Sequence, residues 1–180
     1  MKAPHTILTL TLLCLTLMLS TGCQKDTPDD GTLPDNFAFS LTFGCYGISY
    51  YDSSTGKLIK TTDATHPEDY ITTAFLTDEQ LLQIWEQMQS IDIFSYPDIY
   101  DPNPGVMSSP TMTLVLYLSY TDAESGKTTE KKIACENIAI SYSSDDRGGQ
   151  KFLTLCRTVE NMLYETPEWQ ALPDYEFYYD

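Results

Sequence analysis

The chain has 180 residues with 26 acidic and 10 basic side chains, a formal net charge of −16 at pH 7. Nucleic-acid binding draws its affinity from Lys and Arg side chains that neutralise phosphates, and the longest basic run here is Lys131-Lys132, so the composition excludes a nucleic-acid partner. The same charge repels an anionic membrane surface. A neutral, basic or metallic partner fits this composition.

Residues 6–23, TILTLTLLCLTLMLSTGC, follow Lys2 as an apolar run that ends in small residues and a cysteine. The run is too short to cross a bilayer as a permanent helix and is typical of a secretory signal. It resembles the signal of bacterial prolipoproteins, in which a peptidase cuts before a cysteine whose thiol receives diacylglycerol. The resemblance implies cleavage after Gly22 and a lipid on Cys23. An ordinary secretory signal cleaved nearby and an uncleaved anchor are the alternatives.

Three segments follow from this interpretation: a signal peptide at 1–22, an acidic tether at 23–36 and one domain at 37–180. Residues 24–36 combine charge, Pro and Gly without periodicity, which is typical of a solvated linker. The roughly 158 residues left after cleavage, with all of the chain's 13 Tyr, 7 Phe and 2 Trp, suffice for one hydrophobic core. We expect an extracytoplasmic protein of the cell envelope, held to a bacterial membrane by the lipid on Cys23.

Residues 37–45 alternate apolar and small side chains, which predicts a half-buried strand. We expect this strand to run on to a turn at 52–57, where Asp52 can accept turn amides and Gly56 allows a positive φ. Residues 58–61 then return as the hairpin partner. After a loop around His66, residues 70–75 are predicted to be extended.

The strongest local signal predicts a helix over 77–90. Thr77 is placed as N-cap with Gln80 as its capping-box partner, and Leu76 can pack on Leu81. Apolar side chains follow at helical spacing on one side, namely Leu81, Ile84, Trp85, Met88 and Ile91. The prolines that come next predict a long irregular loop.

The second half of the chain repeats this order. Residues 111–120 alternate as a strand, residues 122–127 form a turn, and the return strand runs from 128 to about 142. An amphipathic helix is then predicted to end before Pro167. We therefore expect an α+β fold, an antiparallel sheet with two amphipathic helices on one face.

The turns at 52–57 and 122–127 share the pattern D-x-x-[S/T]-G-K at an offset of 70 residues. One interpretation is a duplicated strand-strand-helix unit. The other is chance convergence on a favourable hairpin turn, and the sequence leaves both open.

The domain also carries Cys45, Cys135 and Cys156, an odd number, so three buried thiols and a single disulfide both remain open. These cysteines lack C-x-x-C spacing and His66 is the only histidine after cleavage, so we expect no metal site and no cofactor. The loop with Asp98, Asp101, Asn103 and Gly105 has a partial calcium-ligand spacing without the regular order. We interpret it as a solvated acidic loop.

No motif predicts catalysis. Residues 126–128 resemble the end of a phosphate loop, but Thr121 replaces the first glycine and the context is a turn between strands. His66 would have to serve in any triad, and no nucleophile turn accompanies it. We expect a protein without enzymatic activity.

Aromatic side chains supply the candidate binding surface, which we place at Tyr46, Tyr50, Tyr51, Tyr100 and Trp169. Exposed aromatic rings suit protein hot spots or neutral sugars. The favoured function is a non-catalytic binding or envelope-interaction module with a protein partner. A solute- or glycan-binding lipoprotein is the alternative, and an acid-using hydrolase the third class. A flat aromatic patch would favour a protein and a concave aromatic cleft a small ligand.

Overall fold

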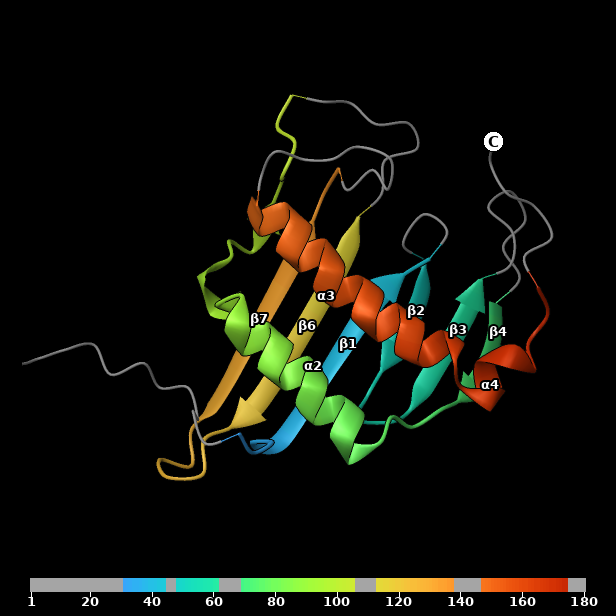
Figure 1. Ribbon diagram of the computed structural model, residues 1–180, viewed down its shortest axis with the longest axis horizontal. Coiled ribbons are helices and arrows are strands. Elements are labelled where there is room, and N and C mark those ends of the chain that lie inside the picture. The colour runs from blue at the N-terminus through green and yellow to red at the C-terminus, as the bar shows by residue number, and fades with distance from the viewer. Residues whose placement is uncertain (1–30, 45–47, 62–68, 106–112, 138–146, 175–180) are drawn as a thin grey trace, which may run out of the picture.

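One layer of helices lies on one face of a single sheet (Figure 1). The structure, a computed structural model, describes residues 31–44, 48–61, 69–105, 113–137 and 147–174. The strands are β1 (Asp35–Phe43), β2 (Ser49–Asp52), β3 (Lys57–Thr61), β4 (Asp69–Thr73), β5 (Ile99–Tyr100), β6 (Leu114–Thr121) and β7 (Thr128–Cys135). The helices are α2 (Asp78–Ser90), the short 3-10 helix η2 (Ile93–Ser95), α3 (Arg147–Tyr164) and α4 (Pro167–Gln170).

The described strands form a seven-stranded sheet in the order β4-β3-β2-β1-β6-β7-β5, with β1 at its centre. All pairings between neighbours are antiparallel except the last, in which Ile99 and Tyr100 of β5 run parallel to β7. The parallel strand arises because α2 carries the chain from the β4 edge across the sheet to the opposite edge (Figure 1). The predicted α+β class and the placement of both amphipathic helices on one face are confirmed, whereas the purely antiparallel sheet is wrong at β5.

The first predicted strand is in fact two strands. We expected one strand from residue 37 to the turn at 52–57, but the chain reverses between β1 and β2, and Phe43 pairs with Ser49 in an antiparallel register. Gly44 lies at the start of the reversal with φ 72°, a backbone conformation that glycine adopts without steric cost. The segment predicted to be an irregular loop after the first helix likewise contains η2 and β5.

The capping box predicted for α2 is present. The Thr77 side-chain oxygen accepts a hydrogen bond from the Gln80 backbone N–H at 3.2 Å, and Gln80 Oε1 accepts one from the Thr77 backbone N–H at 2.9 Å. Both contacts satisfy donors that the first turn of a helix leaves without a partner. The helix thus begins where the sequence places it.

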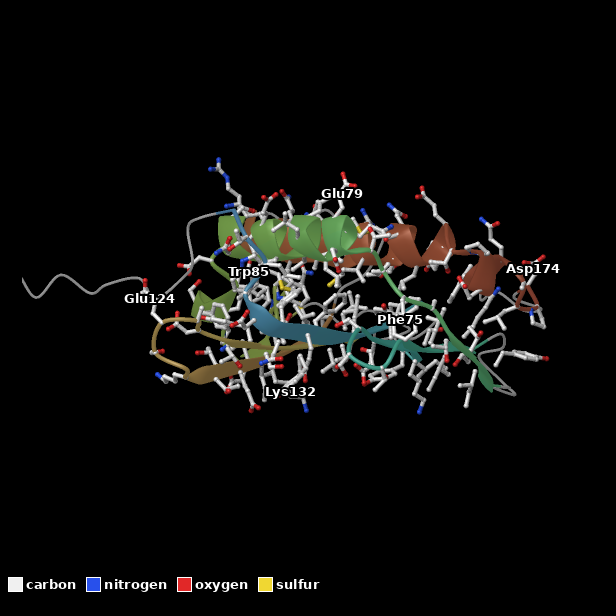
Figure 2. The ribbon with its side chains drawn as sticks, turned by 90° about the horizontal axis from the view of Figure 1, so that it is seen from below. Phe75, Glu79, Trp85, Glu124, Lys132 and Asp174 are labelled. Atoms are coloured by element: carbon white, nitrogen blue, oxygen red, sulfur yellow. The ribbon has the colours of Figure 1, made fainter. Side chains whose placement is uncertain are left out.

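The core lies between the helices and the sheet (Figure 2). Trp85 of α2 is 1% exposed, and its ring centroid lies 5.2 Å from that of Phe37 on β1 and 5.0 Å from that of Tyr120 on β6. From α3, Phe152, Leu155 and Val159 are buried against the same face of the sheet. Each such side chain contributes about 1.5–3 kcal/mol when fully buried, so the apolar sides of α2 and α3 hold the two layers together.

The two turns that share the D-x-x-[S/T]-G-K pattern connect β2 to β3 and β6 to β7, as predicted. Asp52 Oδ1 accepts from the Ser54 backbone N–H at 2.9 Å, and Asp122 Oδ1 accepts from that of Ser125 at 2.7 Å. The hydrogen bonds from Ser125 hold the pKa of Asp122 below its ordinary value. The two hairpins lie on either side of β1 in the sheet. The duplication stays a prediction.

Replacing Thr77 by Ala tests the capping box. The loss of the hydrogen bond from the Gln80 backbone N–H to the Thr77 hydroxyl should lower the free energy of unfolding by about 1 kcal/mol, measured by urea denaturation, while the backbone N–H of residue 77 still donates to Gln80 Oε1. Thr154→Ala is the control, because Thr154 is exposed within α3 and its hydroxyl only donates to the Gln150 carbonyl. The control should change stability by less than about 0.5 kcal/mol. Equal effects of the two substitutions would contradict a specific role for the cap.

Candidate binding surfaces

Two of the five aromatic residues proposed for a binding surface lie in the core. Tyr51 is 0% exposed, burial raises its pKa, and its hydroxyl donates a hydrogen bond to the Ala74 carbonyl at 3.3 Å. Trp169 of α4 is 8% exposed and packs on Phe43 with ring centroids 5.7 Å apart. The prediction that these two rings are surface contacts is therefore wrong, because β2 and α4 turn them toward the helix side of the sheet.

The other proposed residues have different positions. Tyr100 is half-buried on the helix side, where its ring lies 5.2 Å from that of Tyr96. Tyr46, like Cys23, for which a lipid is expected, lies outside the described residues. Tyr50 faces the opposite side of the sheet, because side chains alternate along β2 and its neighbour Tyr51 points into the core. Tyr50 is thus the one proposed aromatic that the structure places on an uncovered surface.

An apolar row crosses the uncovered face of the sheet. The residues of this row lie on adjacent strands in matching register and, in sheet order, are Ile71, Ile59, Tyr50, Thr42, Val115, Ala134 and Ile99. The Val115 backbone N–H donates to Thr42 Oγ1 at 2.8 Å, which joins the two halves of the row across β1 and β6. Six steps between strands of about 4.8 Å each make the row about 29 Å long.

The apolar row is accessible. Its two ends, Ile71 and Ile99, are 63% and 69% exposed, and the side chains between them are half-buried by their neighbours in the sheet. None of the described helices covers this face, since α2 and α3 lie on the other one (Figure 2). Lys132 marks this face in Figure 2, where its side chain projects from the sheet on the side opposite Trp85 and the helices. The described helices therefore leave this face of the sheet, with its apolar row, uncovered.

A polar row runs beside the apolar one, and the pairing of the strands places in it Thr73, Lys57, Asp52, Ser40, Tyr117 and Lys132. Hydrogen bonding to Glu130 raises the pKa of Tyr117. Burial raises the pKa of Asp52, but hydrogen bonds from Ser54 and Thr55 outweigh it and the pKa is lowered. This row carries two lysines and one aspartate, in contrast to the strongly negative chain as a whole.

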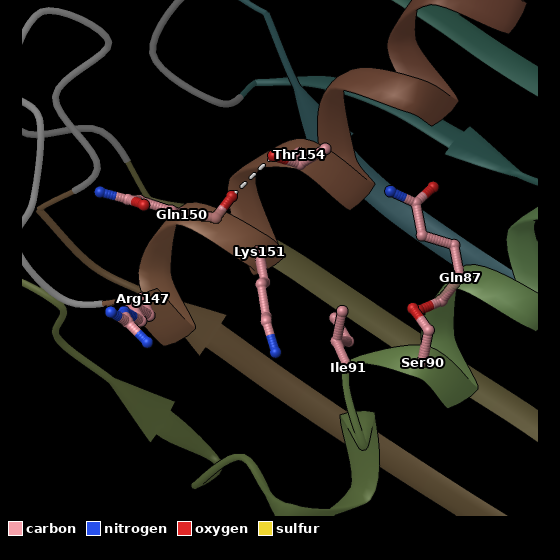
Figure 3. A pocket seen from close by; sticks show the side chains of 7 residues that line it. All are labelled: Gln87, Ser90, Ile91, Arg147, Gln150, Lys151 and Thr154. Atoms are coloured by element: carbon pink, nitrogen blue, oxygen red, sulfur yellow. Dashed lines mark hydrogen bonds between the residues drawn. The ribbon is translucent and has the colours of Figure 1, made fainter.

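A second candidate is an open hollow of about 460 Å³ between the end of α2 and the start of α3 (Figure 3). Arg147 and Lys151 line it together with Ile91, and its lining residues include no acidic side chain. Both cations are exposed, and Asp145 and Asp146 directly precede Arg147 in the sequence. The hollow therefore offers no desolvated charge to a ligand, and the flat face is the stronger candidate.

Lys60 is a buried cation that sequence reasoning missed. It is 3% exposed on the helix side of β3, and its Nζ lies 4.7 Å from the centroid of the Trp169 ring. Burial lowers the pKa of Lys60, and Asp174 partly opposes this effect. The contact joins α4 to the sheet, so we interpret Lys60 as a structural residue. In the alternation of β3, Lys60 lies between two residues that face away from the helices. This position is the signal that could have identified it as a residue of the helix side.

The acidic side chains considered as metal ligands make other contacts, and the described cysteines are buried. Asp98 forms an ion pair with Lys131 at 2.8 Å, and Asp101 Oδ1 accepts from the Asn103 backbone N–H at 2.9 Å. The described residues include no group of three potential metal-ligating side chains. Cys135 and Cys156 are buried thiols that form no disulfide, and Cys45 lies outside the described residues.

Glu160 of α3 is a carboxyl group whose pKa burial raises. Tyr164 donates to Glu160 Oε2 at 3.3 Å, and the pKa of the nearby Cys156 thiol is raised well above its ordinary value, chiefly by burial. A hydrolase of the acid-using class needs two carboxyl groups in one cleft. Glu160 does not line the hollow beside Arg147, so the structure supplies no such pair there.

No protein-family model matches the chain, and searches of curated proteins and of solved structures give no significant match either. Among the described helices, none combines the length and apolar composition that crossing a membrane requires.

The buried position of Lys60 predicts a pH dependence of stability. Its folded-state pKa lies below the ordinary value of 10.5, so the unfolded chain binds more protons between the two values and stability rises with pH in that window. Lys60→Met should remove this rise while leaving other titrations unchanged. Urea denaturation of both proteins between pH 8 and 10.5 measures the difference. A parallel pH dependence in the two proteins would show that Lys60 is not desolvated.

Proposed function

We propose that the protein is a lipid-anchored, extracytoplasmic module of a bacterial cell envelope that binds another protein through the open face of its sheet and catalyses no reaction. The observation that carries this proposal is the apolar row. Soluble proteins rarely expose a contiguous apolar surface that is several strands wide, and such surfaces mark sites of interaction. The uncovered face measures about 29 Å across its strands, a width that suits a protein interface.

The shape of the face favours a protein over a small ligand. A small-molecule site buries most of its ligand in a concave pocket, whereas the apolar row lies on the surface of a sheet between two exposed isoleucines, Ile71 and Ile99. Tyr50 and Tyr117 present aromatic edges with polar tips, as protein interfaces often do. A solute- or glycan-binding lipoprotein remains the second candidate, because Tyr50 and Tyr117 lie on this face next to the hydroxyl groups of Thr42 and Ser40.

The anchor follows from residues 6–23 and Cys23. The diacylglycerol would hold the domain at the bilayer, while the net charge of −16 keeps its surface from binding anionic lipid directly. The acidic tether at 23–36 then sets the distance between the membrane and the domain, roughly 40 Å for 13 fully extended residues. A partner within that distance could reach the open face without entering the bilayer.

Replacing Cys23 by Ser tests the anchor. The lipid cannot attach to serine, so the chain should move from the membrane fraction to the soluble fraction or remain uncleaved, and it should lose incorporation of radiolabelled fatty acid. Ser20→Ala, a neighbouring change that keeps the cysteine, is the control and should leave both readouts intact. Fatty-acid labelling of the serine variant would contradict lipidation of Cys23.

A pair of charge substitutions tests the open face. Ile71→Glu combined with Ile99→Glu adds two charges to the exposed ends of the apolar row and should abolish the cross-linked adduct with the partner in intact cells, because charges are excluded from the centre of protein interfaces. Gln83→Glu combined with Gln150→Glu adds the same charge to the helix side and should retain the adduct. Loss of the adduct in both double variants, or in neither, would contradict binding through this face.

A further inference from the structure

Among the described strands β4 lies at an edge, and none of them pairs with its outer side. It pairs with β3 over five residues, from Lys57 opposite Thr73 to Thr61 opposite Asp69, and it ends the strand order of the sheet. The opposite edge is β5, which has only two residues. An edge as short as β5 offers little backbone for pairing, whereas five residues are the usual length of a strand.

The register shows which backbone groups of β4 point outward. The Ala74 backbone N–H donates to the Gly56 carbonyl at 2.8 Å, so the backbone of Ala74 faces the β2–β3 hairpin. Backbone direction alternates along an antiparallel strand, and therefore Thr72 also faces β3, while Ile71 and Thr73 face the free side. Two N–H and two C=O groups are thus directed away from the sheet.

The β4 edge has few of the features that protect edge strands from pairing with other chains. Its sequence, DYITT, contains no Lys and no Pro, its one charged side chain is Asp69 at the start of the strand, and its described register with β3 has no bulge. Ile71 is 63% exposed and Phe75, just beyond the strand, is 67% exposed. A Cβ atom added at Gly56 would lie 2.8 Å from Phe75 Cε1, so the ring of Phe75 packs closely over the β2–β3 turn and presents an exposed apolar surface where β4 ends.

We infer that β4 accepts an extended segment of the partner protein as an additional strand, which pairs with the outward backbone groups of Ile71 and Thr73. This inference rests on the proposed function and names the mode by which the partner binds. In strand addition the main-chain hydrogen bonds supply affinity, and the side chains that alternate on one face supply specificity. The added strand would extend the apolar row beyond Ile71.

The chemistry of the segment follows from the edge and from the charge of the chain. Residues of the segment that face the open side would lie next to Ile71 and within reach of Phe75, so they should be apolar or aromatic at alternate positions. The net charge of the whole chain is −16 and Asp69 lies at the start of the edge, so a neutral or basic segment is favoured over an acidic one, although the polar row next to β4 also contains Lys57. Pairing of β4 with β4 of a second copy would bring two such charges together and is disfavoured for the same reason.

The test uses the full-length lipoprotein in its host cells with a photoreactive amino acid at Phe75, beside the edge, or at Tyr50, on the open face. Both positions should give an adduct with one and the same protein. Mass spectrometry of the Phe75 adduct should identify a neutral or basic segment with alternating apolar residues. Glu79, which points away from the sheet (Figure 2), is the control position and should give no adduct with that protein.

Ile71→Pro separates strand addition from binding to the face. Proline removes the outward N–H of Ile71 and leaves the bonds of Thr72 to β3 in place, and proline is tolerated on edge strands. It should abolish the Phe75 adduct, whereas Ile71→Val should retain it. Thr73→Pro is a second variant of the same kind, and a thermal melt verifies that each variant folds.

The outcomes distinguish the inference from the proposed function. If the Tyr50 adduct and the Phe75 adduct both persist in folded Ile71→Pro, strand addition is overturned. Binding through the open face would still stand in that case. The absence of an adduct from either position would overturn both. An adduct of twice the mass of the chain would overturn the inference in favour of a second copy. Slow hydrogen exchange at the amides of Ile71 and Thr73 in the purified full chain would overturn it in favour of a segment of the chain itself, such as residues 175–180.

Discussion

The packing of α2 and α3 on one face of the sheet determines the role of every strand residue. Along β1 and β6 the side chains that point toward the helices, such as Phe39 and Leu116, are buried, while their neighbours remain half-buried on the other face. A side chain period of two means that a shift of one residue would exchange these sets. The contacts of Trp85 with Phe37 and Tyr120 fix this register by joining α2 to two strands. Because the described helices cover only one face of the sheet, the other face, which carries the apolar row, is left open.

Local signals in the sequence predicted local structure well. The capping box of Thr77 and Gln80, the helical spacing around Trp85 and the turn at 122–127 depend on residues within a few positions of each other, and all are present. The reversal after β1 was not predicted, because the apolar alternation continues to Cys45 and only Gly44 indicates the bend. The pairing of β5 with β7 joins residues far apart in the sequence, so no local pattern could predict it.

The candidate surface could be predicted only in part for the same reason. Tyr50 and Tyr51 are adjacent aromatic residues, and nothing in their composition tells which faces the core; the pairing of β2 with β1 decides it. The apolar row is spread over all strands of the sheet, from Ile71 to Ile99, and becomes visible only when the register is known. Lys60 illustrates the same limit, since no sequence signal singled it out and its side chain is buried beside the Trp169 ring. In the function that we propose, the open face with its apolar row and the β4 edge bind one partner together.

Hydroxyl-radical footprinting of the full-length protein, purified and in isolated envelopes, tests the central claim most directly. In the purified protein, the radicals should modify Ile59, Tyr50 and Val115 on the open face and also the outer side chains of α2 and α3. In envelopes that contain the partner, modification of the open face should fall several-fold, while modification of the helices should stay unchanged. Protection confined to the helices, or an open face modified equally in both preparations, would contradict the account.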